Sequence, residues 1–163
     1  MALLLAALAI TACAQPAPPL LESRVPPGPF SLFYEYGGDE LGEHNRRLLA
    51  NLMELRRAGH ANFFFVEGYS DTADTDQQSV DVSRRRAWKV HDYLVEAGVP
   101  SEAITVRYYG EACPLVETVD GVREPQNRRV QIWFSESRET LRRSEHCAAP
   151  PSPTSAPASP FAA

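Results

Sequence analysis

A short, continuous apolar run at residues 62–68, Asn-Phe-Phe-Phe-Val-Glu-Gly, does most to limit the folds open to this chain. Such a run is typical of a strand in the middle of a sheet, buried on both faces. The polar residues 69–78 follow it, and this loop is longer than the roughly two to six residues that usually join a strand to a helix. The next apolar periodicity predicts a helix from about Ser79 to Ala97. A long loop at the exit of a central strand is usually functional.

One face of this predicted helix carries an arginine where an apolar residue belongs. The members of the face recur at helical spacing: Val82, Arg86, Val90, Tyr93 and Ala97. Burying an unpaired guanidinium is costly, so we expect a carboxylate partner for Arg86. The nearby candidates are Asp71, Asp74, Asp76 and Asp81. A purely internal salt bridge, or a stem that packs while its head reaches water, would also satisfy the arginine.

The loop and the start of the helix together offer both kinds of charge. Residues 69–78 are rich in Asp, Ser, Thr and Gln, which accept hydrogen bonds. A helix N-terminus presents free N–H groups and the positive end of the helix dipole. Acceptors for an ammonium group therefore stand beside donors for a carboxylate, and this pairing predicts a site for a zwitterion.

Several short blocks follow one another in a recognisable order. They read Gly-Tyr-Ser-Asp at 68–71, Val-Ser-x-Arg-Arg-Ala at 82–87, Tyr-Gly-Glu at 109–111 with Pro114, and Asn-Arg-Arg-Val at 127–130. From about Phe30 to Phe134 their order and spacing resemble the OmpA-like peptidoglycan-binding domain. The resemblance implies an α/β fold of the α+β sandwich type, ordered β-α-β-α-β-β, with a mixed four-stranded sheet and helices packed on it.

In that family, the loop aspartate and the arginine just before the alanine hold the diaminopimelate residue of the peptidoglycan stem peptide. The matching positions here are Asp71 and Arg86. The resemblance extends the expected ligand-binding set to Tyr69, Ser70, Ser79, Asn127 and Arg129. Position 74 carries Asp where the family usually has Gly, and position 79 carries Ser where it commonly has Asn. The segment 120–126 is longer than the common spacing, which leaves the role of Arg123 open.

The remaining pattern predicts a single domain over residues 30–147. The expected elements are strands at 30–36, 62–68, 104–109 and 130–134 and helices at 39–57 and 79–97. Asp39 would cap the first helix. Ligands of such folds bind beyond the carboxyl ends of the strands, which is where Asp71 falls.

The N-terminal residues predict export. The apolar run of residues 3–10 is too short to span a membrane and is typical of a signal peptide, residues 1–12. Residues 10–13, Ile-Thr-Ala-Cys, resemble a bacterial lipobox, which would make Cys13 the acylated, palmitate-bearing first residue of the mature chain. Residues 12–14 also fit an A-x-A cleavage site, which would release a soluble periplasmic protein. We expect residues 13–29 to form a Pro-rich linker and residues 148–163 a disordered tail.

The net charge, the cysteines and the acidic loop bear on the ligand class, on a disulfide and on a metal site. A formal net charge of −5 argues against nucleic acid. Cys113 and Cys147 remain once Cys13 is lipidated, and an oxidising periplasm would allow them to pair, but the sequence does not fix their distance. The acidic residues 71, 74 and 76 lack the glycine and the bidentate glutamate of a calcium loop, so we expect no metal and no cofactor.

Two functional classes compete with wall binding. The motifs contain no nucleophile with a base and an orienting group beside it, and the histidines are scattered along the chain. We therefore expect that the protein is not an enzyme. Docking of a periplasmic protein of a Tol-type envelope complex is the stronger alternative, because the family includes peptidoglycan-associated lipoproteins that also bind such a partner. The sequence therefore predicts an outer-membrane lipoprotein, anchored on the periplasmic face, that binds peptidoglycan.

Overall fold

The computed structural model describes residues 29–137 and Cys147. In chain order, the elements are β1 (Phe30–Phe33), α1 (Glu43–Arg57), β2 (Phe63–Gly68), α2 (Asp76–Glu96), a 3₁₀ turn (Ser101–Ala103), β3 (Ile104–Tyr108) and β4 (Arg129–Ser135). The strands form one sheet in the order β1-β4-β2-β3. β2 and β3 are parallel, whereas β4 is antiparallel to both β1 and β2. The predicted α+β sandwich with a mixed four-stranded sheet is confirmed.

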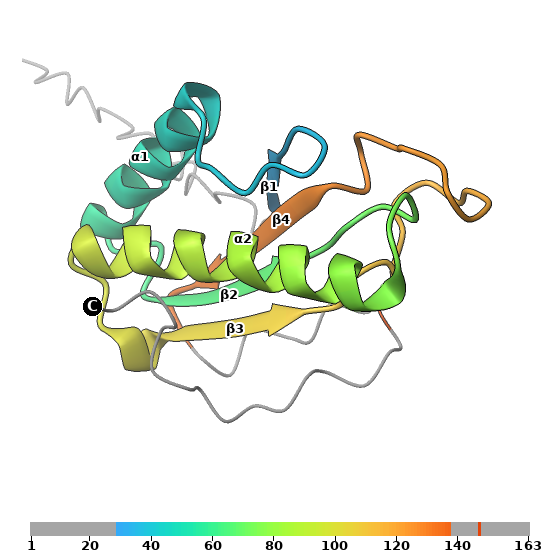
Figure 1. Cartoon of the computed structure of the whole chain (residues 1–163). Coiled ribbons are helices and arrows are strands. Elements are labelled where there is room, and N and C mark those ends of the chain that lie inside the picture. The colour runs from blue at the N-terminus through green and yellow to red at the C-terminus, as the bar shows by residue number, and fades with distance from the viewer. Residues whose placement is uncertain (1–28, 138–146, 148–163) are drawn as a thin grey trace, which may run out of the picture.

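Both helices pack on one face of the sheet (Figure 1). Because successive side chains of a strand point to opposite faces, each strand divides its residues between two environments. Phe64, Val66, Val130 and Ile132 face the helices and form the main core. The alternate positions, such as Glu67, lie on the face that neither helix covers. The sheet therefore has an apolar face under the helices and a mixed face behind it.

A capping box sets the start of α2. The Thr75 hydroxyl accepts from the Gln78 backbone N–H at 3.4 Å, and the Gln78 side chain accepts from the Thr75 N–H at 3.1 Å. The helix consequently begins at Asp76, earlier than the predicted start at Ser79. Thr-x-x-Gln is a capping signature, so the sequence contained this signal.

The predicted cap of the first helix is wrong. α1 begins at Glu43 after Gly42, and the Asp39 carboxylate instead accepts from the side chains of Arg85 and Lys89 in α2, each at 2.7 Å. Partial burial raises the pKa of Asp39, but the bonds from Lys89 and Arg85 outweigh it and hold that pKa below its usual value. The connection between β1 and α1 is thereby fastened to α2.

Glycine allows the end of β2 to touch α2. A Cβ atom at Gly68 would lie 2.2 Å from the Ser83 carbonyl oxygen, far closer than atoms pack. The Ser83 hydroxyl in turn accepts from the Gly110 N–H at 3.1 Å, and Gly110 has a φ of +58°, which favours glycine. These contacts hold the end of β2 and the turn after β3 against α2 at Ser83.

Several expectations fall outside the described residues. They are the signal peptide, the lipidation of Cys13, nearly all of the Pro-rich linker and the C-terminal tail. Within residues 29–137, no helix is both long and apolar enough to cross a membrane.

Candidate functional site

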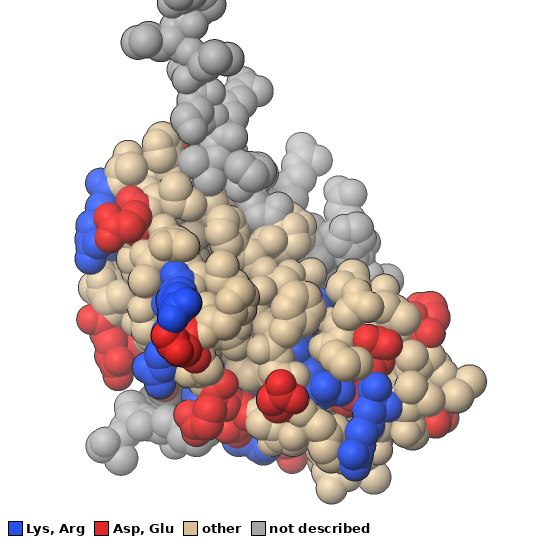
Figure 2. All heavy atoms as spheres, turned by 90° about the horizontal axis from the view of Figure 1, so that it is seen from above, with Lys and Arg blue, Asp and Glu red and all other residues tan. Residues whose placement is uncertain are grey.

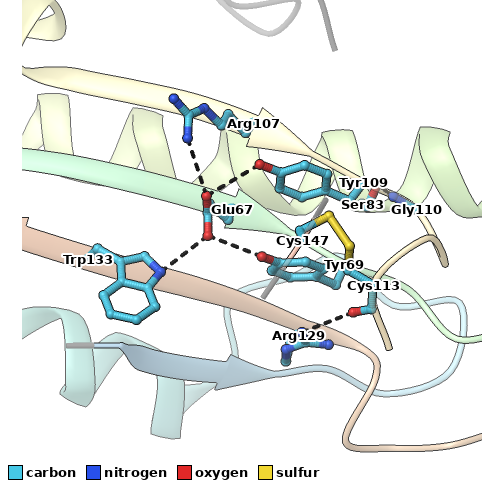
Figure 3. Close-up of a disulfide and its surroundings, with 10 residues drawn as sticks. All are labelled: Glu67, Tyr69, Ser83, Arg107, Tyr109, Gly110, Cys113, Arg129, Trp133 and Cys147. Carbon is cyan, nitrogen blue, oxygen red and sulfur yellow. Dashed lines mark hydrogen bonds and ion pairs between the residues drawn. A yellow bond between two sulfur atoms is a disulfide. The ribbon is translucent and has the colours of Figure 1, made fainter. Parts of the chain in front are cut away.

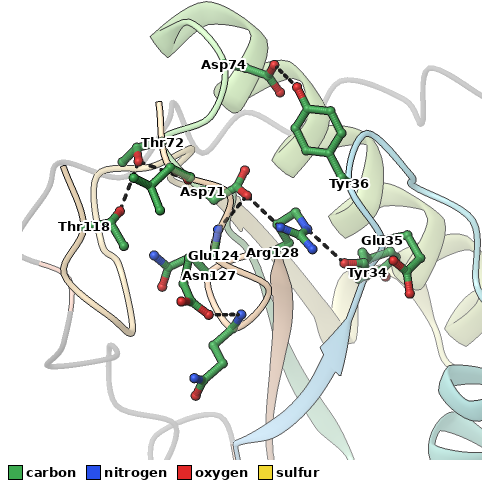
Figure 4. Close-up of polar contacts among 12 residues, drawn as sticks. Tyr34, Glu35, Tyr36, Asp71, Thr72, Asp74, Thr118, Glu124, Asn127 and Arg128 are labelled. Atoms are coloured by element: carbon green, nitrogen blue, oxygen red, sulfur yellow. Dashed lines mark hydrogen bonds and ion pairs between the residues drawn. The ribbon is translucent and has the colours of Figure 1, made fainter. Parts of the chain in front are cut away.

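Asp71 lies buried in the loop that leaves β2, with 1% of its surface exposed. Its Oδ2 atom accepts from Arg128 Nη1 at 2.8 Å and from the Glu124 backbone N–H at 3.1 Å. Among the described residues, no donor reaches Oδ1. Figure 4 shows Arg128 between Asp71 and the segment that carries Tyr34 and Glu35. The Asp71 carboxylate is therefore fixed in place while one of its oxygens keeps its hydrogen-bonding capacity.

Arg86 is also 1% exposed, and its guanidinium is held by backbone carbonyls. Its Nε donates to Gly38 at 2.8 Å, Nη1 to Tyr69 at 3.3 Å and Nη2 to Glu35 at 3.3 Å. The expectation of a carboxylate partner is wrong for the described part of the chain, because these carbonyl oxygens satisfy the N–H groups. Burial lowers the pKa of Arg86 to about 10, so the group stays charged at neutral pH.

Three loops close over these two charges. The Tyr36 hydroxyl donates to Asp74 Oδ1 at 2.8 Å, which joins the loop after β1 to the loop after β2. The Arg123 guanidinium lies 3.7 Å from the centre of the Tyr36 ring and brings in the loop before β4. Arg123, whose role the sequence left open, thus joins the loop before β4 to the loop after β1. Within the described residues no non-glycine has a positive φ, so Asp74 does not need the freedom of the usual glycine.

Ser79 and Asn127 fasten the surrounding loops. The Ser79 hydroxyl lies 3.3 Å from the Asp71 carbonyl oxygen and 3.2 Å from Glu111 Oε2. Asn127 accepts from the backbone N–H groups of residues 115 and 116 and donates to the carbonyl of residue 116, at 2.8–2.9 Å. Both side chains are fully buried. They connect the loops around the Asp71 carboxylate, and their predicted contact with a ligand stays a prediction.

Tyr69 and Arg129 lie on the helix-free face of the sheet instead (Figure 3). The Arg129 guanidinium stacks 3.9 Å from the centre of the Tyr69 ring and donates to the Cys113 carbonyl at 3.2 Å. Cys113 and Cys147 form a disulfide with their Cα atoms 5.4 Å apart, which answers the pairing that the sequence left open. The structure thus separates the predicted set: Asp71, Ser79, Arg86 and Asn127 hold the loops beyond β2 together, whereas Tyr69 and Arg129 flank the disulfide. Ser70 is 3% exposed, and its backbone N–H donates to the Gly110 carbonyl at 2.8 Å.

A second buried carboxylate, Glu67, organises this helix-free face. It accepts from Tyr69 at 3.1 Å, Trp133 at 3.2 Å and Tyr109 at 3.5 Å. The Arg107 guanidinium lies 3.7 Å away. Burial raises the pKa of Glu67, against the opposing effect of these donors. Figure 3 shows the aromatic donors converging on the carboxylate beside the disulfide.

The residue that sequence reasoning missed is Arg128. The resemblance assigns only Asn127 and Arg129 of the Asn-Arg-Arg-Val block to the site. A signal existed, because Val130 faces the core and alternation then places Arg128 and Arg129 on opposite faces of the sheet. The arginine on the helix side is the one that reaches Asp71.

Charge on the surface is mixed in sign. Figure 2 shows basic and acidic side chains interspersed over the face that it presents, without a broad area of one sign. A polyanion such as nucleic acid needs a continuous basic surface, and this face does not offer one.

A sequence profile of the OmpA family matches residues 33–128, which is more than half of the chain. This chain belongs to the OmpA family. An outer membrane protein of Gluconacetobacter diazotrophicus is 33% identical over 109 residues, covering 63% of this chain and 29% of that protein. The sodium-type flagellar protein MotY of Vibrio parahaemolyticus is 30% identical over 102 residues, covering 62% of this chain and 35% of that protein. The matches thus span about a third of these two relatives.

Solved structures of OmpA-like domains share the fold. The peptidoglycan-associated lipoprotein of Burkholderia pseudomallei superimposes with a TM-score of 0.58 at 18% identity, covering 64% of this chain and 89% of that one. The OmpA-like domain of FopA1 from Francisella tularensis gives a TM-score of 0.53 at 23% identity, covering 63% of this chain and 68% of that one. The predicted family is therefore confirmed by sequence, and its fold by structure.

Proposed function

We propose that this OmpA-family protein binds peptidoglycan non-covalently through the diaminopimelate residue of the stem peptide, and so tethers the outer membrane to the cell wall. Family membership supports the ligand class. Among the similar structures are a peptidoglycan-associated lipoprotein and a cell wall anchor of Pseudomonas aeruginosa. One observation carries the mechanism: the buried Asp71 carboxylate, whose Oδ2 is bonded twice while no described donor reaches Oδ1.

The proposed recognition is charge complementarity with a zwitterion. The ammonium group of diaminopimelate donates to Asp71 Oδ1, while Arg86 and the N-terminus of α2 hold its carboxylate. The present partners of Arg86 include the carbonyls of Glu35 and Gly38, so the loop after β1 must shift for the ligand carboxylate to replace them. A charge-assisted hydrogen bond contributes about 1.5–3 kcal/mol, so losing either residue weakens binding about tenfold or more.

The site suits binding rather than catalysis. The charged groups of Asp71, Arg86 and Arg128 are engaged in holding backbone and loops, and each is nine-tenths or more buried. Such groups supply fixed charges for a ligand of complementary charge, and they do not need to transfer protons to do so.

The tether requires an anchor, and the lipobox-like residues 10–13 supply the candidate. In the proposed mature protein, acyl chains on Cys13 insert into the outer membrane, and the linker places the domain on the periplasmic side. The measurement is cell fractionation with labelled palmitate. Cys13→Ser should lose the label and leave the membrane fraction, whereas a label retained by that variant would exclude this anchor.

Docking of a periplasmic protein is the second candidate function. Exposed apolar side chains favour it, since Leu115, Val119 and Val122 of the loop before β4 are 52%, 77% and 37% exposed. Flagellar proteins, MotY and MotB of Helicobacter pylori, also appear among the similar proteins. A protein-docking domain without wall affinity would bind neither of the wall preparations described next.

Changing the ligand tests the proposed function without changing the protein. The full-length protein is sedimented with peptidoglycan that contains diaminopimelate, and separately with peptidoglycan that contains lysine at the same position. Lysine keeps the side-chain ammonium but lacks the second carboxylate. We expect sedimentation with the first preparation and about tenfold weaker binding to the second. Failure to sediment with the first would contradict the proposal.

A further inference from the structure

A cavity of about 530 Å³ opens beside the Asp71–Arg128 ion pair. It lies between the end of β1 with the residues that follow it and the segment that leads into β4. Its lining residues are Phe33, Tyr34, Glu35, Pro125, Gln126 and Arg128. Pockets for small ligands typically enclose about 300–1,000 Å³, so this space accommodates one or two amino-acid residues of a peptide. Asp71 and Arg86 do not line it, which makes it a neighbour of the proposed diaminopimelate contacts.

Arg128 brings an oriented cation to this cavity. Its Nε donates to the Tyr34 carbonyl at 3.1 Å and its Nη1 to Asp71 Oδ2 at 2.8 Å. Within residues 29–137 and Cys147, no acceptor takes a bond from Nη2. The side chain is only 7% exposed, so its orientation is fixed by packing as well as by these two bonds. A guanidinium held in this way presents its remaining donors without further ordering, and its planar fork matches a carboxylate.

The cavity also has an apolar wall. Phe33 is 46% exposed, an unusual degree for a phenylalanine on a strand that packs in a sheet. Phe33 is the last residue of β1 and lines the cavity. Pro125 adds a second apolar surface. Together they suit a small apolar side chain rather than a sugar, which would need several hydrogen-bonding groups.

Glu35 places a negative charge on the same cavity. Its side chain is exposed, and Figure 4 shows it on the Tyr34 side of Arg128. A single cation beside a single anion accepts one carboxylate at the arginine and disfavours a second one nearby. The cavity is therefore matched to a ligand end that carries one free carboxylate and a small apolar group.

We propose that this cavity is a subsite for the free carboxyl terminus of an uncrosslinked stem peptide. Arg128 binds the terminal carboxylate, and Phe33 with Pro125 contacts the methyl group of the terminal alanine. This inference rests on the proposed function, because the stem peptide continues beyond diaminopimelate into D-alanine. It implies that the protein discriminates against the donor stem of a crosslink, because the terminal D-alanine carboxylate of that stem is consumed in the crosslinking amide bond.

Two synthetic ligands test the subsite with the full-length wild-type protein. One is a stem tetrapeptide that contains diaminopimelate and ends in D-alanine, and the other is the same peptide with a terminal carboxamide. Isothermal titration calorimetry should show the carboxamide binding about tenfold more weakly, because the charge-assisted bond to Arg128 is lost. Equal affinity for both peptides would overturn the subsite while leaving the proposed function standing. Binding of neither would contradict the proposed function itself.

Two variants test whether the preference for the free carboxylate depends on the cavity residues Arg128 and Glu35. Arg128→Lys keeps a positive charge that can pair with Asp71 but loses the planar fork, so it should reduce the tenfold preference to about twofold. Glu35→Gln, at an exposed position that spares the fold, should strengthen binding of the free carboxylate about two- to threefold and leave the carboxamide unchanged. A Glu35→Gln variant that binds both peptides as the wild type does, together with a preference untouched by Arg128→Lys, would place the carboxylate elsewhere.

Discussion

Two regions of the molecule each bury a carboxylate beside an arginine, the helix-free face of the sheet and the loops at the end of β2, here called the loop side, yet the surroundings of the two carboxylates differ. On the helix-free face, Glu67 takes bonds from three aromatic side chains next to a disulfide. On the loop side, Asp71 has one oxygen bonded twice and the other without a described donor. Its partner Arg128 lines the cavity of about 530 Å³, and Arg107, the partner of Glu67, is not among the residues that line that cavity.

A carboxylate that only holds the fold together can be told apart from one that can also bind a ligand. Burial is equal for the two carboxylates, at 0% and 1% exposure, so burial does not distinguish them. What distinguishes the two carboxylates is the hydrogen-bonding capacity that each has left and the access of its arginine partner to the cavity. A fully bonded carboxylate holds the fold together, whereas one with an oxygen to spare can also bind a ligand.

The largest expected change in stability is on the helix-free face. Replacing both Cys113 and Cys147 with serine opens a covalent link across a sequence separation of 34 residues. The chain-entropy estimate for such a loop is about 4 kcal/mol of unfolding free energy. Urea denaturation measures this loss. The folded fraction of the variant should still sediment with peptidoglycan, and a folded variant without affinity would show that the two regions are not independent.

Arg86→Lys tests the carbonyl-bound arginine on the loop side. Lysine keeps the charge but cannot satisfy the carbonyls of residues 35, 38 and 69 at once, so we expect a loss of about 1–3 kcal/mol in unfolding free energy. Affinity for peptidoglycan should fall about tenfold. Arg85→Lys, next in the chain and 40% exposed at its side chain, is the matched control and should change neither quantity much.

Glu67→Gln tests the buried acid through pH. The pKa of Glu67 is raised, so its contribution to stability is present below the ordinary glutamate pKa and is lost as pH rises through the raised value. A glutamine does not titrate, and thermal unfolding of the variant should therefore depend less on pH across this window. Glu54→Gln, which is 68% exposed at its side chain, should keep the wild-type pH profile. A Glu67→Gln profile that parallels the wild type would contradict the raised pKa.

The smallest expected effect is at the bridge between the β1–α1 connection and α2. Asp39→Asn removes the ion pairs to Arg85 and Lys89, and because these groups are partly exposed the loss should be about 1 kcal/mol or less. The pKa of Asp39 is lowered, so its contribution is present at neutral pH and is lost as pH falls through that lowered value. At a pH below that lowered pKa, the variant and the wild type should unfold at the same temperature. A difference in unfolding temperature that persists at that pH would show that Asp39 stabilises the fold through packing instead of charge.

Much of the fold was readable because local signals agreed with one another. The apolar run before Gly68, the helix bearing Arg86 and the alternating final strand all appear where the sequence predicts them. The insertion of β4 between β1 and β2 was not predictable from periodicity, since strand order depends on long-range packing. Only the family resemblance led us to expect a mixed sheet.

The site was less readable, because its partners come from distant loops. Asp71 and Arg86 were singled out by their positions, but the acceptors of Arg86 are backbone carbonyls, which leave no mark in a sequence. Arg128 is harder to predict, because two adjacent arginines look alike in a sequence; in the structure Arg129 begins β4, whereas Arg128 lies just before it and reaches Asp71. The Thr75 capping box, in contrast, was present in the sequence and was missed.

The most direct test of the central claim exchanges one buried carboxylate for an amide in each region. Asp71→Asn and Glu67→Gln make the same chemical change, and in each the amide oxygen can still accept from the two donors of one carboxylate oxygen, Oδ2 of Asp71 and Oε2 of Glu67. Wild type and the two variants are sedimented with peptidoglycan that contains diaminopimelate, after circular dichroism has shown that all three are folded. We predict that Asp71→Asn binds about tenfold more weakly or worse while Glu67→Gln binds as the wild type does. Equal binding by all three, or a loss confined to Glu67→Gln, would contradict the assignment of the loop side as the binding site.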